Sequence, residues 1–281
     1  MAIINTRQAA VDVLARISHK PGIHVGYETL DEYTYGVRPG ELVILAGRPG
    51  MGKTAAMCAM ILHTSKNIVP LVFSMEMGQT GLIERMLVNQ AGVSYQRAIR
   101  DQLHTPEKKR MLDAADVLSQ RDILIEGTSL QTPQGVERTL KFLLEQGVHV
   151  SCVFIDHLQY MRTEPYIADP YVSITELTKY LKALAREYQL PFVVLCQLNR
   201  AVESRDSHRP RLSDLRDSGS IEQDADHIWF LYRQGYYDPN STETAAEIIV
   251  AKNRNGAVGV AQVYWNASLM SFRKPISLSE I

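Results

Sequence analysis

A short glycine-rich stretch has the residue types and spacing of a phosphate-binding loop. Residues 47–54 fit the pattern G-x-x-x-x-G-K-[ST], follow an apolar segment and precede a helix-compatible stretch. Glycines let the backbone wrap closely around phosphates, and the first N–H groups of a helix add partial positive charge. We therefore expect a site for ATP and Mg²⁺, in which Lys53 reaches the β- and γ-phosphates and the Thr54 hydroxyl binds the metal ion. The expected phosphate-binding residues are Gly47, Arg48, Pro49, Gly50, Met51, Gly52, Lys53, Thr54 and Ala55.

Three polar residues at the ends of apolar segments supply the other groups that hydrolysis needs. Asp156 follows Val-Phe-Ile, so its carboxylate is expected at the carboxyl edge of a sheet as a second Mg²⁺ contact. Glu76 follows residues 71–74 and is a candidate to orient or polarise the attacking water. Gln197 follows residues 192–196, and its amide can bond the γ-phosphate or the water. Each also has an ordinary alternative, as a turn residue or as an acid that complements a helix N-terminus.

These side chains need a sheet to hold them, and the apolar pattern predicts one. Segments of strand length alternate with helix-compatible stretches such as 55–64 and 173–188. Their hydrophobicity is continuous rather than alternating, which is typical of strands buried on both faces. We therefore expect an α/β fold with a mainly parallel central sheet and helices on both faces. The expected strands are residues 41–46, 69–74, 122–125, 150–155 and 192–196.

The end of the chain follows a different pattern. Residues 247–252 and 258–265 flank Asn255-Gly256, the strongest short turn signal, and predict an antiparallel hairpin at the edge of the sheet. Lys252 and Arg254 stand beside this turn. Taken alone, they are most simply two solvated charges at a hairpin tip.

Charge and cysteine content narrow the class of protein. Lys plus Arg number 30 and Asp plus Glu number 31, so any basic surface for nucleic acid must be local. Cys58, Cys152 and Cys196 stand singly in apolar stretches without zinc-ligand spacing, which indicates core positions and a reducing cytoplasm. The sequence has neither a bilayer-spanning apolar run nor the pattern of a secretory signal. We expect a soluble, cytoplasmic protein.

The N-terminal residues predict a separate helix. Apolar residues recur at helical spacing over residues 3–17, and Pro21-Gly22 separates them from the next apolar run. We expect a linker-type helix within residues 1–20 and one larger domain over residues 21–281. The apolar face of this helix must either pack on its own domain or dock on a neighbouring subunit.

Several stretches together resemble the C-terminal motor domain of the DnaB-type replicative DNA helicases. The resemblance extends from about Gly22 to Arg273, and the matching motifs together are far more specific than a phosphate loop alone. It implies a RecA-like P-loop NTPase fold and a ring of six copies with ATP between neighbouring subunits. It also implies 5′-to-3′ movement on single-stranded DNA through the central hole. The stretches that carry it are residues 26–31, 48–55, 74–77, 155–159, 197–200, 214–226 and 252–256.

The resemblance also implies roles for individual residues. Glu76 would be the catalytic base, Asp156 the acid on the metal side and Gln197 the sensor. Arg85 would help to hold the phosphates. Arg254 would be an arginine finger supplied in trans to the ATP of the next subunit, with Lys252 beside it.

A long polar stretch, residues 199–220, is rich in arginine, and such lengths usually mean function or disorder. The DNA-binding loop of the family falls on Arg216, Asp217 and Gly219. Backbone N–H groups and an arginine can hold phosphates without reading bases. The alternative is a flexible surface loop, because acidic residues dilute the basic ones.

Relative to the full-length family, the chain begins at the linker helix and lacks the N-terminal collar domain, which in relatives strengthens the ring and engages primase. A natural minimal helicase and a fragment both fit. The family's further partners are a helicase loader and primase.

Two other functions stay open: a RecA/RadA-like recombinase that forms filaments, and a non-enzymatic subunit that regulates or loads a host helicase. Retention of Lys53, Thr54, Glu76 and Arg254 argues against the second of these.

Overall fold

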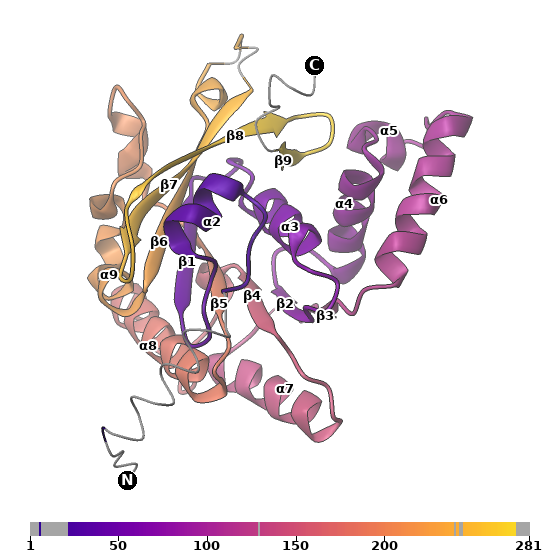
Figure 1. Ribbon diagram of the computed structural model, residues 1–281. Coiled ribbons are helices and arrows are strands. Elements are labelled where there is room, and N and C mark those ends of the chain that lie inside the picture. Colours follow the sequence, from indigo (N-terminus) through magenta and orange to yellow (C-terminus); the bar gives the residue numbers. More distant parts are fainter. Residues whose placement is uncertain (1–5, 7–21, 129, 239, 242–243, 274–281) are drawn as a thin grey trace.

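The computed structural model describes residue 6 and residues 22–273, except 129, 239 and 242–243. In this part of the chain nine strands form one sheet in the order β3-β2-β4-β5-β1-β6-β7-β8-β9 (Figure 1). The strands are β1 (Leu42–Gly47), β2 (Pro70–Ser74), β3 (Leu124–Glu126), β4 (Cys152–Asp156), β5 (Phe192–Gln197), β6 (His227–Tyr232), β7 (Ala245–Asn253), β8 (Gly259–Asn266) and β9 (Ser271–Arg273).

The middle of the sheet is parallel, as the continuous hydrophobicity of its strands predicts. β1 pairs with β5 on one side and with β6 on the other, and β4 lies between β5 and β2. Every residue of β1, β2 and β4 is buried, which is the pattern of strands covered on both faces. The carboxyl ends of these strands therefore share one edge of the sheet.

Helices cover both faces of this sheet, which confirms the predicted α/β architecture. Alternate residues of β1 enter two cores. Val43 and Leu45 pack with α2 and α3, whereas Leu42, Ile44 and Ala46 pack with α7 and α8. The helices are α2 (Glu28–Thr34), α3 (Lys53–His63), α4 (Gln79–Ala91), α5 (Tyr95–Ile99), α6 (Thr105–Ser119), α7 (Pro133–Glu145), α8 (Pro170–Tyr188) and α9 (Gly219–Asp224), with short 3₁₀ helices η1 (Leu158–Tyr160), η2 (Arg200–Ser204), η3 (Leu212–Ser218) and η4 (Gln234–Tyr236).

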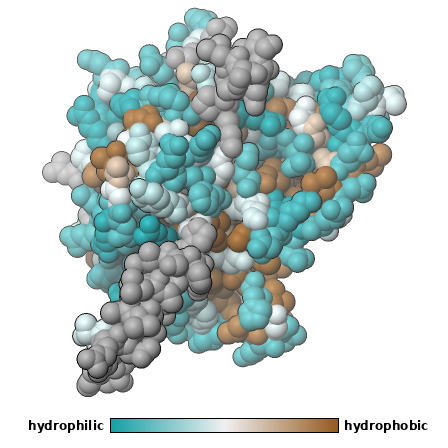
Figure 2. All heavy atoms as spheres, viewed as in Figure 1, coloured by the Kyte–Doolittle hydropathy of each residue, from teal (hydrophilic) through white to brown (hydrophobic). Residues whose placement is uncertain are grey.

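Helices α4, α5 and α6 form a lobe beside the sheet (Figure 1). Its small core contains Val88, Val93 and Ala114. Hydrophobic side chains also reach the surface of this lobe, among them Ile83 and Leu112, and Figure 2 shows brown patches over it.

Two strands depart from the sequence-based expectation. β6, which was not predicted, is fully buried between β1 and β7. It begins only two residues after α9, and neither of these two residues is a glycine or proline that would mark the start of a strand. β7 and β8 form the predicted antiparallel hairpin, but its predicted position at the sheet's edge is wrong. The edge strand on this side is β9, which is only three residues long and too short to give a readable pattern.

Other expectations have mixed outcomes. The three cysteines are buried, as predicted. The N-terminal helix expected over residues 3–17 lies outside the described residues. Across the part of the chain that the structure describes, no helix has both the length and the apolar character needed to cross a bilayer.

Candidate nucleotide-binding site

The phosphate loop connects the end of β1 to the start of α3 at the carboxyl edge of the sheet. Gly50 and Gly52 have φ values of +75° and +99°, a region that favours glycine. A Cβ atom on Gly52 would lie 2.9 Å from the Phe272 ring, so the loop has no space for a side chain there. The loop residues predicted from the sequence therefore form a tight turn that leads into a helix N-terminus.

Lys53 is the first residue of α3, and its side chain folds back over the loop. Its Nζ donates to the carbonyl oxygens of Gly47, at 3.1 Å, and Arg48, at 3.4 Å. Burial lowers the pKa of the Lys53 ammonium, while the nearby carboxylates of Asp156 and Glu76 oppose that shift. The ammonium thus lies among acidic groups and loop carbonyls, where a phosphate can replace the carbonyl contacts.

Thr54 and Asp156 meet across the sheet, as the sequence predicts for a shared metal site. The Thr54 hydroxyl donates to Asp156 Oδ2 at 2.7 Å. Asp156 is fully buried, and its Oδ1 has no hydrogen-bond partner among the described residues. Burial raises the pKa of Asp156 to about 6. A buried carboxylate oxygen without a partner, next to a hydroxyl, is a donor set that fits Mg²⁺.

Glu76 lies at the same edge of the sheet. It stands two residues beyond β2, and its carboxylate Oε2 is 3.5 Å from Nε2 of His157. The Glu76 side chain is 47% exposed, whereas the His157 side chain is buried, and burial lowers the pKa of that imidazole. His157 was not predicted as a site residue; its position directly after Asp156 is the signal that could have found it.

Arg85 and Gln197 complete the predicted group. Arg85 projects from α4, and its positive charge acts to lower the pKa of Asp156. Gln197 ends β5 in register with Gly47, the first residue of the loop. The Gln197 backbone N–H donates to Gln159 Oε1 at 3.1 Å, which ties the end of β5 to the segment after β4. The structure therefore brings Arg85 and Gln197 to the same edge of the sheet as the phosphate loop, Asp156 and Glu76.

An aromatic shelf beside the loop was not predicted from the sequence. Arg233 donates to the carbonyl of Gly50 at 3.3 Å, and its guanidinium lies 4.2 Å from the centre of the Trp265 ring. A Cβ atom on Gly50 would lie 3.0 Å from the Tyr236 ring. Arg233 and Tyr236 follow β6 within four residues, and Trp265 lies on β8, so only the pairing of these strands brings the three side chains together.

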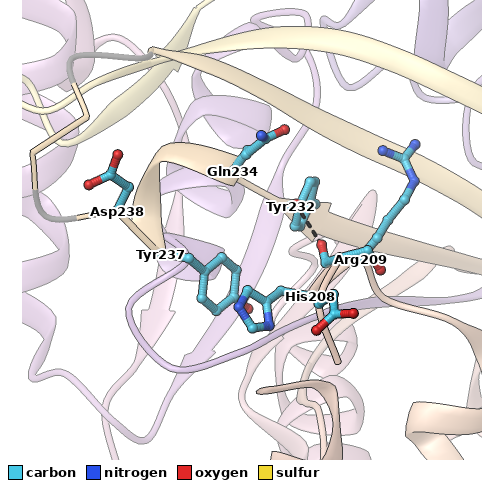
Figure 3. Close-up of a pocket in the computed structure, with 8 residues that line it drawn as sticks. His208, Arg209, Tyr232, Gln234, Tyr237 and Asp238 are labelled. Carbon is cyan, nitrogen blue, oxygen red and sulfur yellow. Dashed lines mark hydrogen bonds between the residues drawn. The ribbon is translucent and has the colours of Figure 1, made fainter. Parts of the chain in front are cut away.

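A pocket of about 480 Å³ is lined in part by His208, Tyr232 and Tyr237, and Figure 3 shows these residues around it. His208 and Tyr237 stack in it with ring centres 4.2 Å apart, and Tyr237 meets Tyr236 edge-on at 5.3 Å. Burial raises the pKa of Tyr237 to about 12. The Tyr237 hydroxyl and His208 Nδ1 are buried and have no hydrogen-bond partners within the described chain.

Lys252 and Arg254 lie at the opposite edge of the sheet. Asn253 pairs with His227 of β6, and His227 pairs with Val43 near the start of β1. Along β1, Val43 lies four residues, or about 13 Å, before Gly47, the first residue of the phosphate loop. The two cations are therefore remote from the phosphate loop of the same chain.

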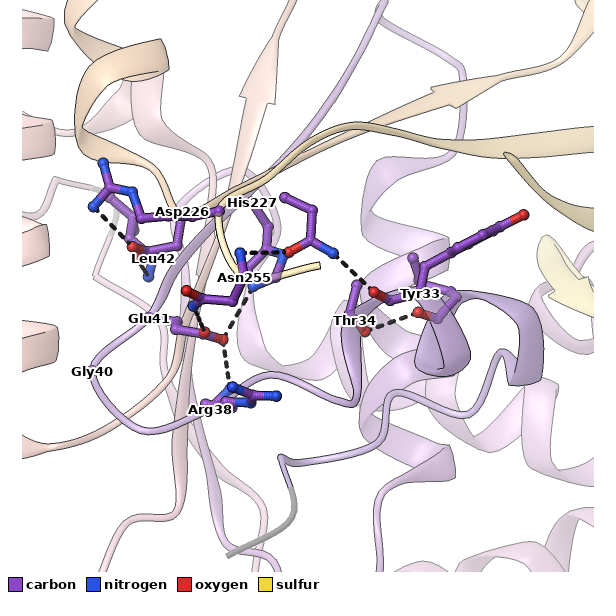
Figure 4. Close-up of polar contacts among 12 residues, drawn as sticks. Tyr33, Thr34, Arg38, Gly40, Glu41, Leu42, Asp226, His227 and Asn255 are labelled. Carbon is purple, nitrogen blue, oxygen red and sulfur yellow. Dashed lines mark hydrogen bonds and ion pairs between the residues drawn. The ribbon is translucent and has the colours of Figure 1, made fainter. Parts of the chain in front are cut away.

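A polar network holds these two cations, and Figure 4 shows the part of it around Glu41, Asp226 and Asn255. Arg254 lies 3.3 Å from the buried carboxylate of Asp226 and donates to the Gln223 carbonyl at 3.0 Å. Lys252 donates to the carbonyls of Glu222 and Ala225 around the end of α9. Further bonds link the turn to buried groups: Asn255 donates to Glu41, and Glu41 pairs with His227.

The polar stretch expected to contact DNA contains defined elements. The backbone at Arg216 and Asp217 belongs to η3, and Gly219 is the first residue of α9. Arg205 and Arg209 are engaged within the subunit, in ion pairs with Asp214 at 2.6 Å and Glu247 at 2.5 Å. Short helices, η2, η3 and the start of α9, occupy most of the stretch.

A parallel sheet with a phosphate loop after β1 and an acid at the end of β4 defines a RecA-like P-loop domain. Residues 22–274 match the family described as DnaB-like helicase C terminal domain. The chain belongs to this family, which confirms the resemblance seen in the sequence.

Individual relatives agree with this assignment. A replicative DNA helicase DnaB of Buchnera aphidicola subsp. Schizaphis graminum is 38% identical over 257 residues, covering 89% of this chain and 55% of the relative. The corresponding protein of Haemophilus influenzae is 35% identical over 282 residues, covering 96% of this chain and 60% of the relative. The chain thus spans less than two thirds of the length of these relatives.

Solved structures show the same relationship. The ATPase domain of G40P has a TM-score of 0.89 and 32% identity, covering 98% of this chain and 100% of that one. A DnaB-like replicative helicase, described together with its interactions with primase, has a TM-score of 0.89 and 32% identity. The match covers 97% of this chain and 69% of the helicase.

Proposed function

We propose that the chain is the ATP-driven motor of a DNA helicase that acts in replication as a ring of six copies. The observation that carries the proposal is the separation of the predicted catalytic groups between two edges of the sheet. The phosphate loop, Asp156 and Glu76 lie at the carboxyl edge, whereas Lys252 and Arg254 lie at the amino edge. A complete site then requires two subunits, with the carboxyl edge of one facing the amino edge of the next.

Within one subunit, the residues act in sequence on ATP. Lys53 exchanges its loop carbonyls for the β- and γ-phosphate oxygens of ATP. Thr54 and Asp156 would hold Mg²⁺, which when bound would supply positive charge to the phosphates. Glu76 orients a water molecule and accepts its proton as the water attacks the γ-phosphorus; the bond from that phosphorus to the bridging oxygen breaks, and ADP leaves with this oxygen. Gln197, in register with the first loop residue, contacts the γ-phosphate or the water and responds to its loss.

The neighbouring subunit supplies the remaining charge. Arg254 leaves its weak contact with Asp226, since half of its side chain is exposed, and approaches the transferred phosphoryl group of the adjacent subunit. A guanidinium there stabilises negative charge that develops in the transition state. Hydrolysis by one subunit then depends on its neighbour, which lets a ring coordinate its steps.

The aromatic shelf is suited to the base of the nucleotide. The Arg233 guanidinium lies over the rings of Tyr236 and Trp265 beside the loop, and planar groups of this kind can stack on any base. We expect nucleotides to bind with little discrimination between bases, because stacking does not read the hydrogen-bonding groups of a base.

DNA contact is assigned to the segment around Arg216, Asp217 and Gly219, at the start of α9. Contacts to phosphates through backbone N–H groups and Arg216 suit sequence-independent movement, in the 5′-to-3′ direction, on single-stranded DNA. The solved relative described with primase supports primase as a partner, and a helicase loader is the further partner we propose.

The direct test is ATP turnover with and without single-stranded DNA over a range of protein concentrations, with oligomeric state followed by light scattering. Stimulation by DNA that rises with assembly into a six-subunit ring would support the proposal. Turnover that depends neither on DNA nor on assembly would refute it, and open filaments would favour strand exchange instead.

A further inference from the structure

Arg48, the second residue of the phosphate loop, directs its guanidinium toward Glu203 and the Leu198 carbonyl. Only 5% of the residue is exposed. Its Nε and NH2 groups contact Glu203 Oε1 at 2.9 and 2.8 Å, and its NH1 donates to the Leu198 carbonyl at 2.7 Å. Leu198 also donates its backbone N–H to the Gly47 carbonyl at 3.3 Å. The loop is therefore fastened to the segment that directly follows Gln197.

Glu203 lies on η2 and is the acidic end of this connection. Its side chain is 47% exposed, so the carboxylate is solvated on one side while its partner is buried. A charge-assisted contact through two nitrogens fixes direction as well as distance. Loss of Glu203 would leave the buried Arg48 guanidinium with one neutral acceptor, the Leu198 carbonyl, among the contacts seen in the described residues.

A second ion pair continues the connection toward the proposed DNA segment. One residue beyond η2, Arg205 contacts both carboxylate oxygens of Asp214, at 2.8 and 2.6 Å, and Asp214 is buried on η3. The backbone N–H of Asn199 donates to the Asp214 carbonyl at 3.3 Å. η3 leads without a break into α9, where the proposed DNA contacts lie.

We propose that Glu203 is a positioning residue that, through Arg48, couples the phosphate loop to the DNA-contacting segment. This inference rests on the proposed function. DNA binding that displaces η3 also moves η2 through the Arg205–Asp214 ion pair. Glu203 transmits this movement through Arg48 to the phosphate loop. By thermodynamic linkage, ATP must then change the affinity for DNA by the same factor as DNA changes the affinity for ATP.

The test compares Glu203→Ala and Glu203→Gln with a matched control, Asp206→Asn, in the assembled protein. Asp206 is an exposed carboxylate three residues further along the same segment. Turnover is measured with and without an oligo-dT strand. Binding of a non-hydrolysable ATP analogue and of oligo-dT is measured separately and in combination.

For Glu203→Ala we expect the stimulation by oligo-dT to fall about fivefold or more, with turnover in the absence of DNA within about twofold of wild type. The effect of the ATP analogue on oligo-dT affinity and the effect of oligo-dT on analogue affinity should fall by equal factors. Glu203→Gln keeps an acceptor oxygen in place, so its stimulation by oligo-dT should fall less than that of Glu203→Ala. The Asp206→Asn control should behave as wild type.

Unchanged stimulation in Glu203→Ala would overturn the inference. Equal losses with and without DNA would also overturn it, because they indicate general damage to the phosphate loop. Failure of the proposed function has a different signature: wild-type protein would then show no stimulation by oligo-dT at all.

Discussion

Removal of the Arg254 guanidinium should separate catalysis from stability. The side chain is 49% exposed and its Asp226 partner keeps bonds from Lys182 and the Leu42 N–H, so Arg254→Ala should cost only about 0–1 kcal/mol of unfolding free energy. An arginine that completes a phosphoryl-transfer site from a neighbour contributes about 10³–10⁵ in rate. We therefore expect near-normal melting temperature and ATP binding, with turnover lost.

Mixed rings provide the decisive assay. Arg254→Ala subunits retain an intact phosphate loop, and Lys53→Ala subunits retain the arginine. In rings formed from equal amounts of the two, about one quarter of the interfaces pair an intact loop with an intact arginine, if subunits mix at random. Turnover should therefore recover to about one quarter of wild type if interfaces act independently.

A matched control uses two defects on the same side of the interface. Lys53→Ala and Glu76→Gln both damage the carboxyl edge, so no interface in their mixed rings has an intact edge and turnover should not recover. If the Arg254→Ala and Lys53→Ala mixture were also inactive in rings shown to contain both subunits, the proposal that Arg254 acts in trans would be wrong.

Four other substitutions test the remaining assignments. Glu76→Gln should preserve nucleotide binding, measured by fluorescence titration, and reduce turnover about 100-fold or more; strong turnover would remove Glu76 as the base. Asp156→Asn should raise the Mg²⁺ concentration for half-maximal turnover by about tenfold or more, and an unchanged Mg²⁺ titration would contradict a metal role. Trp265→Ala should raise KM for ATP and GTP about tenfold alike, and a loss confined to one of them would indicate base reading. Arg216→Ala should weaken binding to all single strands about equally and reduce its salt dependence; an effect on one base sequence would argue against phosphate contact.

The parallel core could be predicted because each central strand is a continuous apolar run, and burial on both faces permits no polar interruption. β6 has the same character, with the sequence His-Ile-Trp-Phe-Leu-Tyr. β6 was not predicted because it begins only two residues after a charged helix, with no turn signal between them. β9 could not be predicted, since three residues carry no measurable period and only pairing with β8 defines it.

Part of the candidate nucleotide-binding site could be predicted from the sequence for a related reason. Asp156, Glu76 and Gln197 follow strands, and parallel strands bring their carboxyl ends together, so adjacency at one edge follows from the pattern alone. The contact of Arg48 with Glu203 joins residues that are 155 positions apart, and no local pattern encodes it. The roles in trans came only from the family resemblance, because a hairpin-tip cation looks the same whether or not another subunit faces it.

Strand direction explains why an arginine on this hairpin cannot reach the phosphate loop of its own chain. β6 runs parallel to β1, so β7, its antiparallel partner, must return to the amino edge, and the turn after β7 places Arg254 there. No rotamer of an arginine spans the length of β1 back to Gly47. The same turn lies against the carboxyl end of α9, whose Glu222 and Gln223 carbonyls accept bonds from Lys252 and Arg254. Because α9 has only six residues, the whole helix is about 9 Å long. The segment assigned to DNA includes the start of this helix, and the two cations bond to carbonyls near its end.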